Sequence, residues 1–163
     1  MADTPHTAAE TTLDLFKKEF FTSLDETFNR VHGIFLDKGT SLFETLDTVT
    51  AEEASRAVAP GAATIAAQVD HLRFYLDVVR EAMANEQVTK TDWGEIWRTV
   101  KAVSPDEWTA IRQRLRESYE RMLEMLKSYD RWEGEYGISS ALGILAHTAY
   151  HLGGIRQALA RHR

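Results

Sequence analysis

The sequence predicts an all-α protein, specifically a four-helix bundle with long crossover connections. Apolar residues recur at steps of three and four through four long segments, and only three prolines and nine glycines interrupt the 163 residues. No segment alternates apolar and polar residues between turn dipeptides, so we expect no strand. Four apolar stripes are buried most simply against one another, and we therefore expect residues 1–163 to form a single domain.

The first helix is expected at about residues 8–37 and the second at about residues 65–84. The first stripe consists of Leu13, Phe16, Phe20, Leu24, Phe28, Val31 and Phe35. The second stripe alternates steps of four and three, as at a bundle seam: Ile65, Val69, Leu72, Leu76, Val79 and Met83. Pro60 and Gly61 break the chain before the second helix, and Thr64 can cap its first turn.

The third helix has the clearest start. Ser104 is a suitable N-cap, Pro105 suits the first helical position, and Glu107 completes a capping box. The fourth helix is expected at about residues 140–161, separated from the third by Gly137.

Two long connections are each expected to hold a short helix. Thr50 and Glu53 form a capping-box pattern within residues 38–63. Residues 85–104 are long enough to cross the end of the bundle, which would let the second helix lie beside the fourth. We expect Trp93, Trp97 and Trp108 to cluster around this crossover and pin it by packing, the alternative being that they roof a pocket.

Composition excludes several classes of function. The net charge of −6, from 19 basic and 25 acidic residues, argues against nucleic-acid binding and against adsorption to an anionic membrane. The chain has no cysteine, so disulfides, thiolate metal sites and a cysteine nucleophile are excluded. The start MADTPHTAAETT does not resemble a signal peptide, and no apolar run approaches the ~18 residues of a membrane span. We expect a cytoplasmic protein.

Histidines carry the strongest functional signal. His147 and His151 are four residues apart in an apolar, glycine-containing part of the fourth helix, so their imidazoles project from one face about 5–6 Å apart and can reach one ion. The best third ligand is His71, in the middle of the second helix beside Leu72, and His32 is its rival. The alternative is that these are core histidines satisfied by hydrogen bonds.

One histidine in the second helix and H-x-x-x-H in the fourth resemble the DinB-like family of metalloenzymes. The resemblance covers nearly the whole chain and includes PGAATIAAQVDHL, which ends beside His71, and HTAYHLGGIRQAL, which begins at His147. It implies a four-helix bundle in which the second and fourth helices are neighbours. It also implies that His71, His147 and His151 bind one divalent ion, zinc or nickel above all, and that the protein is a homodimer.

The sequence departs from this family at one place. Many members follow the last histidine of the motif with glycine and then glutamine. Here Gly153 is followed by Gly154, and the nearest glutamine downstream is Gln157.

Three imidazoles leave a coordination position open, which is typical of catalytic rather than structural zinc sites. The resemblance implies relatives that transfer or isomerise groups with low-molecular-weight thiols such as bacillithiol or mycothiol. The first hypothesis is therefore a metal-dependent transferase that acts on a small molecule with such a thiol as co-substrate. The alternatives are a metal-dependent hydrolase, a non-catalytic stress-related metal-binding protein, and a helical dimerisation module whose histidines are merely buried.

The sequence does not identify a general base, and the catalytic residues stay unknown. Asp70 adjoins His71 but projects about 100° around the helix, which favours a solvent-facing position. Tyr75 lies one turn beyond His71, where it lines a pocket or, more simply, packs in the bundle.

Overall fold

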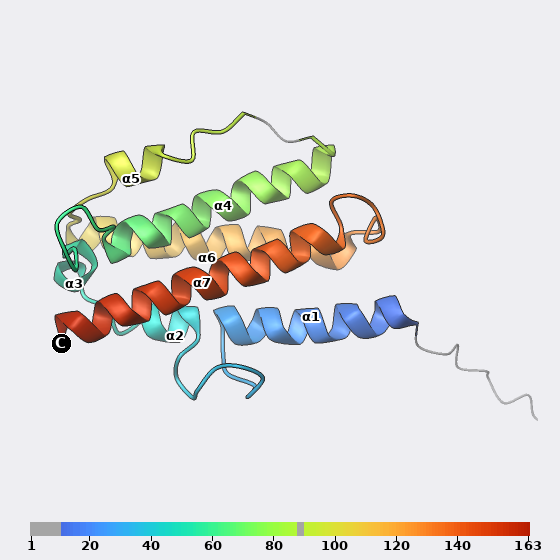
Figure 1. The fold of residues 1–163 in the computed structure, drawn as a ribbon, viewed down its shortest axis with the longest axis horizontal. Helices are drawn as coiled ribbons and strands as arrows, with labels where there is room; N and C mark the ends of the chain where they lie inside the picture. Colours follow the sequence, from blue (N-terminus) through green and yellow to red (C-terminus); the bar gives the residue numbers. More distant parts are fainter. Residues whose placement is uncertain (1–10, 88–89) are drawn as a thin grey trace, which may run out of the picture.

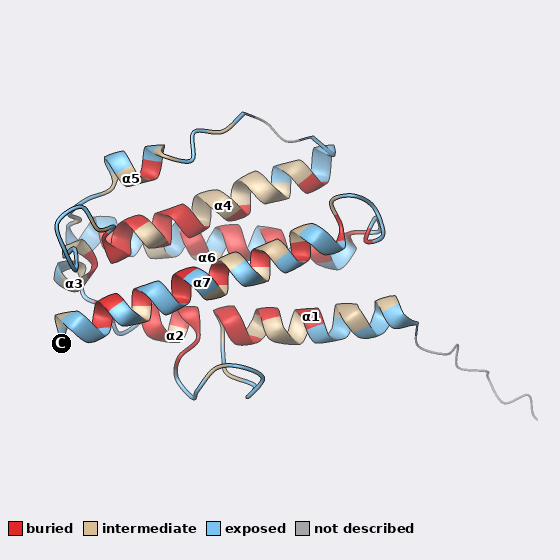
Figure 2. Ribbon diagram, in the orientation of Figure 1, coloured by how far each residue is buried: buried red, intermediate tan, exposed pale blue. Residues whose placement is uncertain are grey.

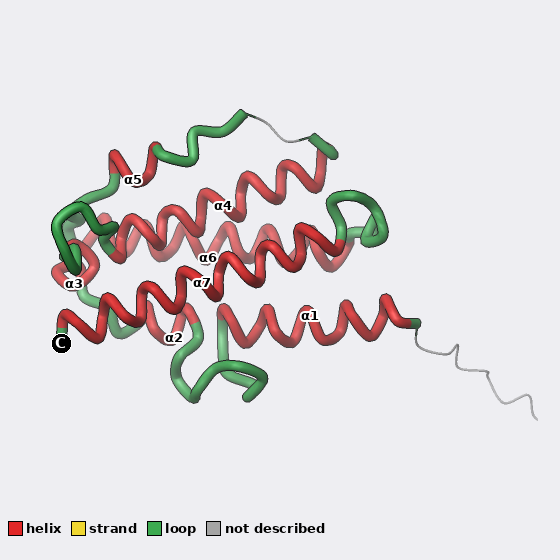
Figure 3. Tube along the Cα trace, viewed as in Figure 1, coloured by secondary structure: helices red, strands yellow, loops and turns green. Residues whose placement is uncertain are grey.

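The computed structural model describes residues 11–87 and 90–163. Within these ranges it has seven helices and no strand, which confirms the predicted all-α class (Figure 3). The helices are α1 (Thr12–Phe28), α2 (Leu42–Leu46), α3 (Ala51–Ser55), α4 (Ile65–Asn85), α5 (Glu95–Thr99), α6 (Pro105–Ser128) and α7 (Ile138–His162).

Four long helices form the bundle. Helix α4 packs against both α6 and α7, and α1 packs against α7 (Figure 1). Helices α4 and α6 run in one direction along the bundle, whereas α1 and α7 run in the other. The predicted second and fourth helices, α4 and α7, are therefore antiparallel neighbours.

The connection between α4 and α6 takes a different path from the one expected. Because these two helices are parallel, the chain must return from the end of α4 to its beginning before α6 can start. The described part of this connection, residues 90–104, makes the return along the bundle beside α4 and carries the short helix α5, rather than crossing only the end of the bundle (Figure 1).

Capping residues predicted the starts of α3, α4 and α6 correctly. Thr64 caps α4 by accepting a bond from the backbone of Ala67, Ser104 and Glu107 form the capping box of α6, and Thr50 and Glu53 form that of α3. Helix α2 was not expected.

The first helix is much shorter than expected: α1 ends at Phe28, and the expected start near Ala8 lies outside the described residues. Gly33 and Gly39 adopt φ values of +83° and +76°, a left-handed conformation that a continuing helix does not allow. As a result Phe35, assigned to the apolar stripe, lies in a loop and is 48% exposed.

A buried carboxylate organises this loop. Glu26 of α1 has no exposed surface, and it accepts bonds of 2.6–3.1 Å from the backbone N–H groups of His32, Ile34, Phe35 and Leu36. Burial opposes ionisation, but these four donors outweigh it and lower the pKa of Glu26 to about 2. The loop therefore folds around one charged acceptor.

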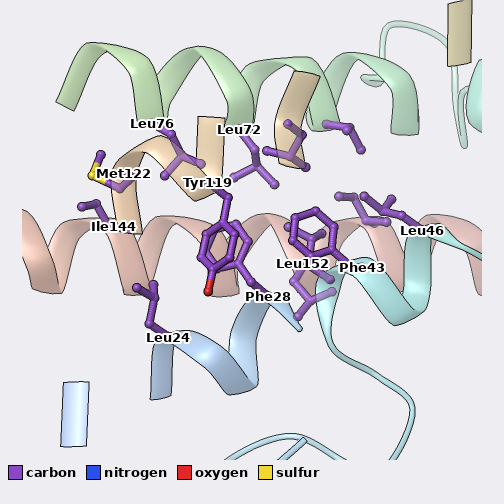
Figure 4. Packing of buried hydrophobic residues seen from close by; sticks show 14 of the residues in the cluster. Leu24, Phe28, Phe43, Leu46, Leu72, Leu76, Tyr119, Met122, Ile144 and Leu152 are labelled. Carbon is purple, nitrogen blue, oxygen red and sulfur yellow. The ribbon is translucent and has the colours of Figure 1, made fainter. Parts of the chain in front are cut away.

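The core lies where the four long helices and α2 meet (Figures 2 and 4). Phe28 and Tyr119 stack with ring centroids 4.2 Å apart, and Leu72, Leu76 and Leu152 are at most 1% exposed. Each such burial contributes roughly 1.5–3 kcal/mol. None of the described helices is long and apolar enough to span a membrane.

We predict that Glu26→Gln lowers the free energy of unfolding by about 2 kcal/mol at pH 7, because a neutral amide is a weaker acceptor for the four N–H groups. The pKa of Glu26 is lower in the folded chain than its unfolded value of 4.5. Its contribution to stability is therefore complete above pH 4.5 and is lost as the pH falls toward 2. The difference between wild type and variant should therefore narrow from pH 7 to pH 3 in urea denaturation. The control is Glu19→Gln, at an exposed position of α1; equal losses from both variants would contradict the assigned role.

Candidate metal centre

The structure brings His71, His147 and His151 together between α4 and α7. Nitrogens that can serve as ligands, one from each ring, all lie within 4.8 Å of one another. His71 and His151 are buried and His147 is half-buried. The rival ligand His32 lies elsewhere, with its Nε2 atom 2.6 Å from the Asp25 carboxylate.

Two glycines of α7 let α4 approach this cluster closely. A Cβ atom on Gly143 would lie 3.1 Å from the Tyr75 hydroxyl, and one on Gly154 would lie 2.9 Å from the Gln68 amide oxygen. At these two positions the absence of a side chain on α7 leaves room for side chains of α4. Gly153, in contrast, faces open space.

The arrangement of the nitrogens fits one divalent ion. The Nε2 atoms of His71 and His147 are 3.2 Å apart. Two nitrogens bound at 2.0–2.1 Å to a tetrahedral ion would be separated by about 3.3 Å. The buried Nδ1 atom of His71 has no hydrogen-bond partner among the described residues. The three rings could therefore hold a metal ion.

Gln68 lies beside the third ring. Its Oε1 atom lies 3.4 Å from Nδ1 of His151, which donates to it in the tautomer that leaves Nε2 free for an ion. Outer partners of this kind orient ligating histidines and set their tautomer. Sequence reasoning did not identify Gln68, although its position one turn before His71 was a usable signal.

The electrostatics keep the rings neutral. Burial, with a smaller contribution from the neighbouring histidines, lowers the pKa of both His147 and His151 to about 4. Burial also lowers the pKa of His71, and the nearby charge of Asp70 partly opposes this. Neutral imidazole is the form that binds metals, so the cluster is in its ligating state at pH 7.

Aromatic rings cover the histidines. Trp97 of α5 lies with its ring centroid 4.4 Å from that of His71, and Tyr75 stacks on His147 at 3.8 Å. Trp93 contacts Tyr75 at 6.1 Å. Trp108 is remote from them and donates to the Val49 carbonyl. The expected single tryptophan cluster is therefore wrong: two tryptophans cover the site and the third closes another part of the core.

Asp70 does not face solvent as its helical position suggested. It is 6% exposed, and its carboxylate lies 3.1 Å from Arg73 and 3.8 Å from Arg114. The side chain projects toward α6, which packs on that face of α4. Asp70 is therefore a paired structural carboxylate rather than a base in the cluster.

A cavity of about 570 Å³ opens beside His151. Its lining comes from α7, α4, α5 and the segment before α4: Val58, Ala62, Ala63, Gln68, Trp97, Tyr150, His151, Gly154, Gln157, Ala158 and Arg161. Among the described residues, no aspartate or glutamate lines it. Apart from His151, Trp97, Gly154 and Gln157, the sequence indicated no role at the site for these residues.

We predict that the metal-free protein loses stability as the pH falls from 6.5 to 4. His147 and His151 have lowered pKa values in the folded state, so the unfolded chain binds more protons in this window. Urea denaturation in the presence of a chelator should show this loss, and the double variant His147→Asn/His151→Asn should show a flatter dependence. Parallel curves for the two proteins would contradict the assignment.

Comparison with known proteins identifies the family. No curated protein and no solved structure matches the chain. A family model described as the DinB superfamily matches residues 37–154, which is most of the chain and includes all three histidines of the cluster. The chain therefore belongs to the DinB superfamily.

Proposed function

We propose that the protein is a divalent-metal-dependent enzyme that transfers a group between a small-molecule substrate and a low-molecular-weight thiol. The observation that carries this proposal is the position of the three-histidine cluster at the edge of a cavity large enough for an organic molecule. Zinc or nickel suits three imidazole donors. A site for metal storage alone would need no such cavity.

The chain's own residues have distinct roles in this proposal. His71, His147 and His151 would hold the ion, and Gln68 would fix the His151 ring. When bound, a divalent ion lowers the pKa of a thiol or water molecule at its open position. Trp97 and Tyr75 exclude water from the histidine faces that they cover.

The lining of the cavity favours a thiol over water as the nucleophile. Hydrolysis usually needs a side chain that accepts a proton from water. The described residues that line the cavity include no carboxylate, and Asp70 is held by arginines. A thiol has a much lower pKa than water and loses its proton near neutral pH without such a base.

We also propose that the protein forms a homodimer. Leu15 of α1 and Leu142 of α7 are 47% and 50% exposed, and these two neighbouring helices supply apolar surface for a second copy.

We predict that protein purified without chelator or metal-affinity resin contains close to one equivalent of zinc or nickel. A variant with His71, His147 and His151 changed to alanine should contain none, while circular dichroism shows that it remains helical. Transfer of a small thiol such as cysteine to 1-chloro-2,4-dinitrobenzene should be faster with the loaded wild type than with the variant. Wild type that is metal-free and takes up neither added ion would overturn the proposal; metal without transfer would leave a binding protein.

We predict that Gln68→Leu weakens metal binding about 10–100-fold, because the His151 ring loses the partner that sets its tautomer and orientation. Competition with a chromophoric chelator measures this affinity. Gln157→Leu is the matched control, since Gln157 lines the same cavity but makes no hydrogen bond to the histidines. The same loss in both variants, or in neither, would contradict the role of Gln68.

A further inference from the structure

The cavity beside His151 is elongated along α7. His151 and Arg161, which both line it, are ten residues apart on this helix, a rise of about 15 Å. Between them the lining of α7 consists of Gly154, Gln157 and Ala158. A molecule that occupies the whole cavity therefore has one end near the histidines and the other near Arg161.

The charge of this cavity is opposite to that of the protein. The chain carries a net charge of −6, yet the described lining residues include no carboxylate, and Arg161 is their one permanently charged side chain. Arg161 makes no ion pair with the described residues, whereas nearby Arg163 is bound to Glu53 at 2.9 Å. The cavity therefore offers an unpaired cation.

Helix dipoles do not change this balance. The beginning of α4 and the end of α7 lie at the same end of the bundle (Figure 1). Their partial charges have opposite signs and largely offset each other. The side chain of Arg161 therefore decides the sign of charge that this end of the cavity attracts.

The remaining lining is suited to an apolar body. Trp97 and Tyr150 offer aromatic rings near His151, with ring centroids 6.1 and 5.2 Å from that of His151. Tyr150 is 77% exposed, and Val58 is also exposed. Exposed aromatic and aliphatic side chains that line a concave surface commonly contact a ligand.

We propose that this cavity binds an elongated organic anion, whose carboxylate or similar group pairs with Arg161 and whose apolar body lies against Trp97 and Tyr150. An organic cation would meet Arg161 without a compensating carboxylate, and a neutral apolar molecule would cover the guanidinium without pairing it. The binding of the anion does not depend on the proposed function. Only the statement that its end near His151 is the reacting group rests on that function.

The test compares two isosteric probes, 2-naphthoate and the neutral 2-naphthamide, by calorimetric titration of chelator-treated protein. Wild type should prefer 2-naphthoate, and Arg161→Gln should weaken its binding about tenfold while leaving 2-naphthamide binding unchanged, the effect of one charge-assisted pair. Arg161→Glu should bind 2-naphthylmethylammonium better than 2-naphthoate. Arg30→Gln, at an exposed loop position, is the matched control and should behave as wild type.

Two outcomes would overturn the inference: no preference for 2-naphthoate in the wild type, or equal binding of 2-naphthoate to the wild type and Arg161→Gln. Metal content should be the same in the wild type and the Arg161 variants, because Arg161 is not part of the histidine cluster. A wild type that neither contains nor takes up zinc or nickel, but still binds 2-naphthoate through Arg161, would refute the proposed function and support the anion site. A wild type that contains zinc or nickel when purified, but does not bind 2-naphthoate after chelator treatment, would refute the anion site and leave the proposed function standing.

Discussion

Helices α4 and α7 come close enough to share a site because two glycines of α7 face side chains of α4. Gly143 leaves room for Tyr75, and Gly154 leaves room for Gln68. The Nε2 atoms of His71 and His147, which belong to these two helices, lie 3.2 Å apart. The contact between α4 and α7 therefore brings the three histidines together, buries them and keeps their imidazole rings neutral.

The topology of the bundle supplies the rest of the site. Parallel α4 and α6 require a connection that returns along α4, and this connection carries α5 beside α4 (Figure 1). Trp97 lies on His71 for that reason and also lines the cavity beside His151. A short α4–α6 hairpin would have left this face of α4 open to water. The long crossover is therefore part of the surroundings of the histidines as well as a connection.

Local signals predicted the helices and the histidine cluster, because caps, apolar periodicity and the i,i+4 pair all act within a few residues. Long-range interactions account for what the sequence did not predict. The end of α1 depends on the Glu26 carboxylate, which gathers N–H groups up to ten residues away. The burial of Asp70 depends on Arg114 in α6, and the cavity depends on residues from four separate segments. Periodicity in one helix carries no information about such partners.

Gly154 and Gln68 are best understood as one unit. The resemblance to the DinB-like family leads one to expect glutamine at the position of Gly154, directly after the glycine that follows the histidine motif. Here that position has no side chain, and the Gln68 amide from α4 occupies the space beside it, 2.9 Å from where a Cβ would stand. The amide then reaches Nδ1 of the same His151 ring. A side chain at position 154 would displace the Gln68 amide from its present position. The absence of glutamine at position 154 of α7 and the presence of Gln68 of α4 beside His151 are therefore linked.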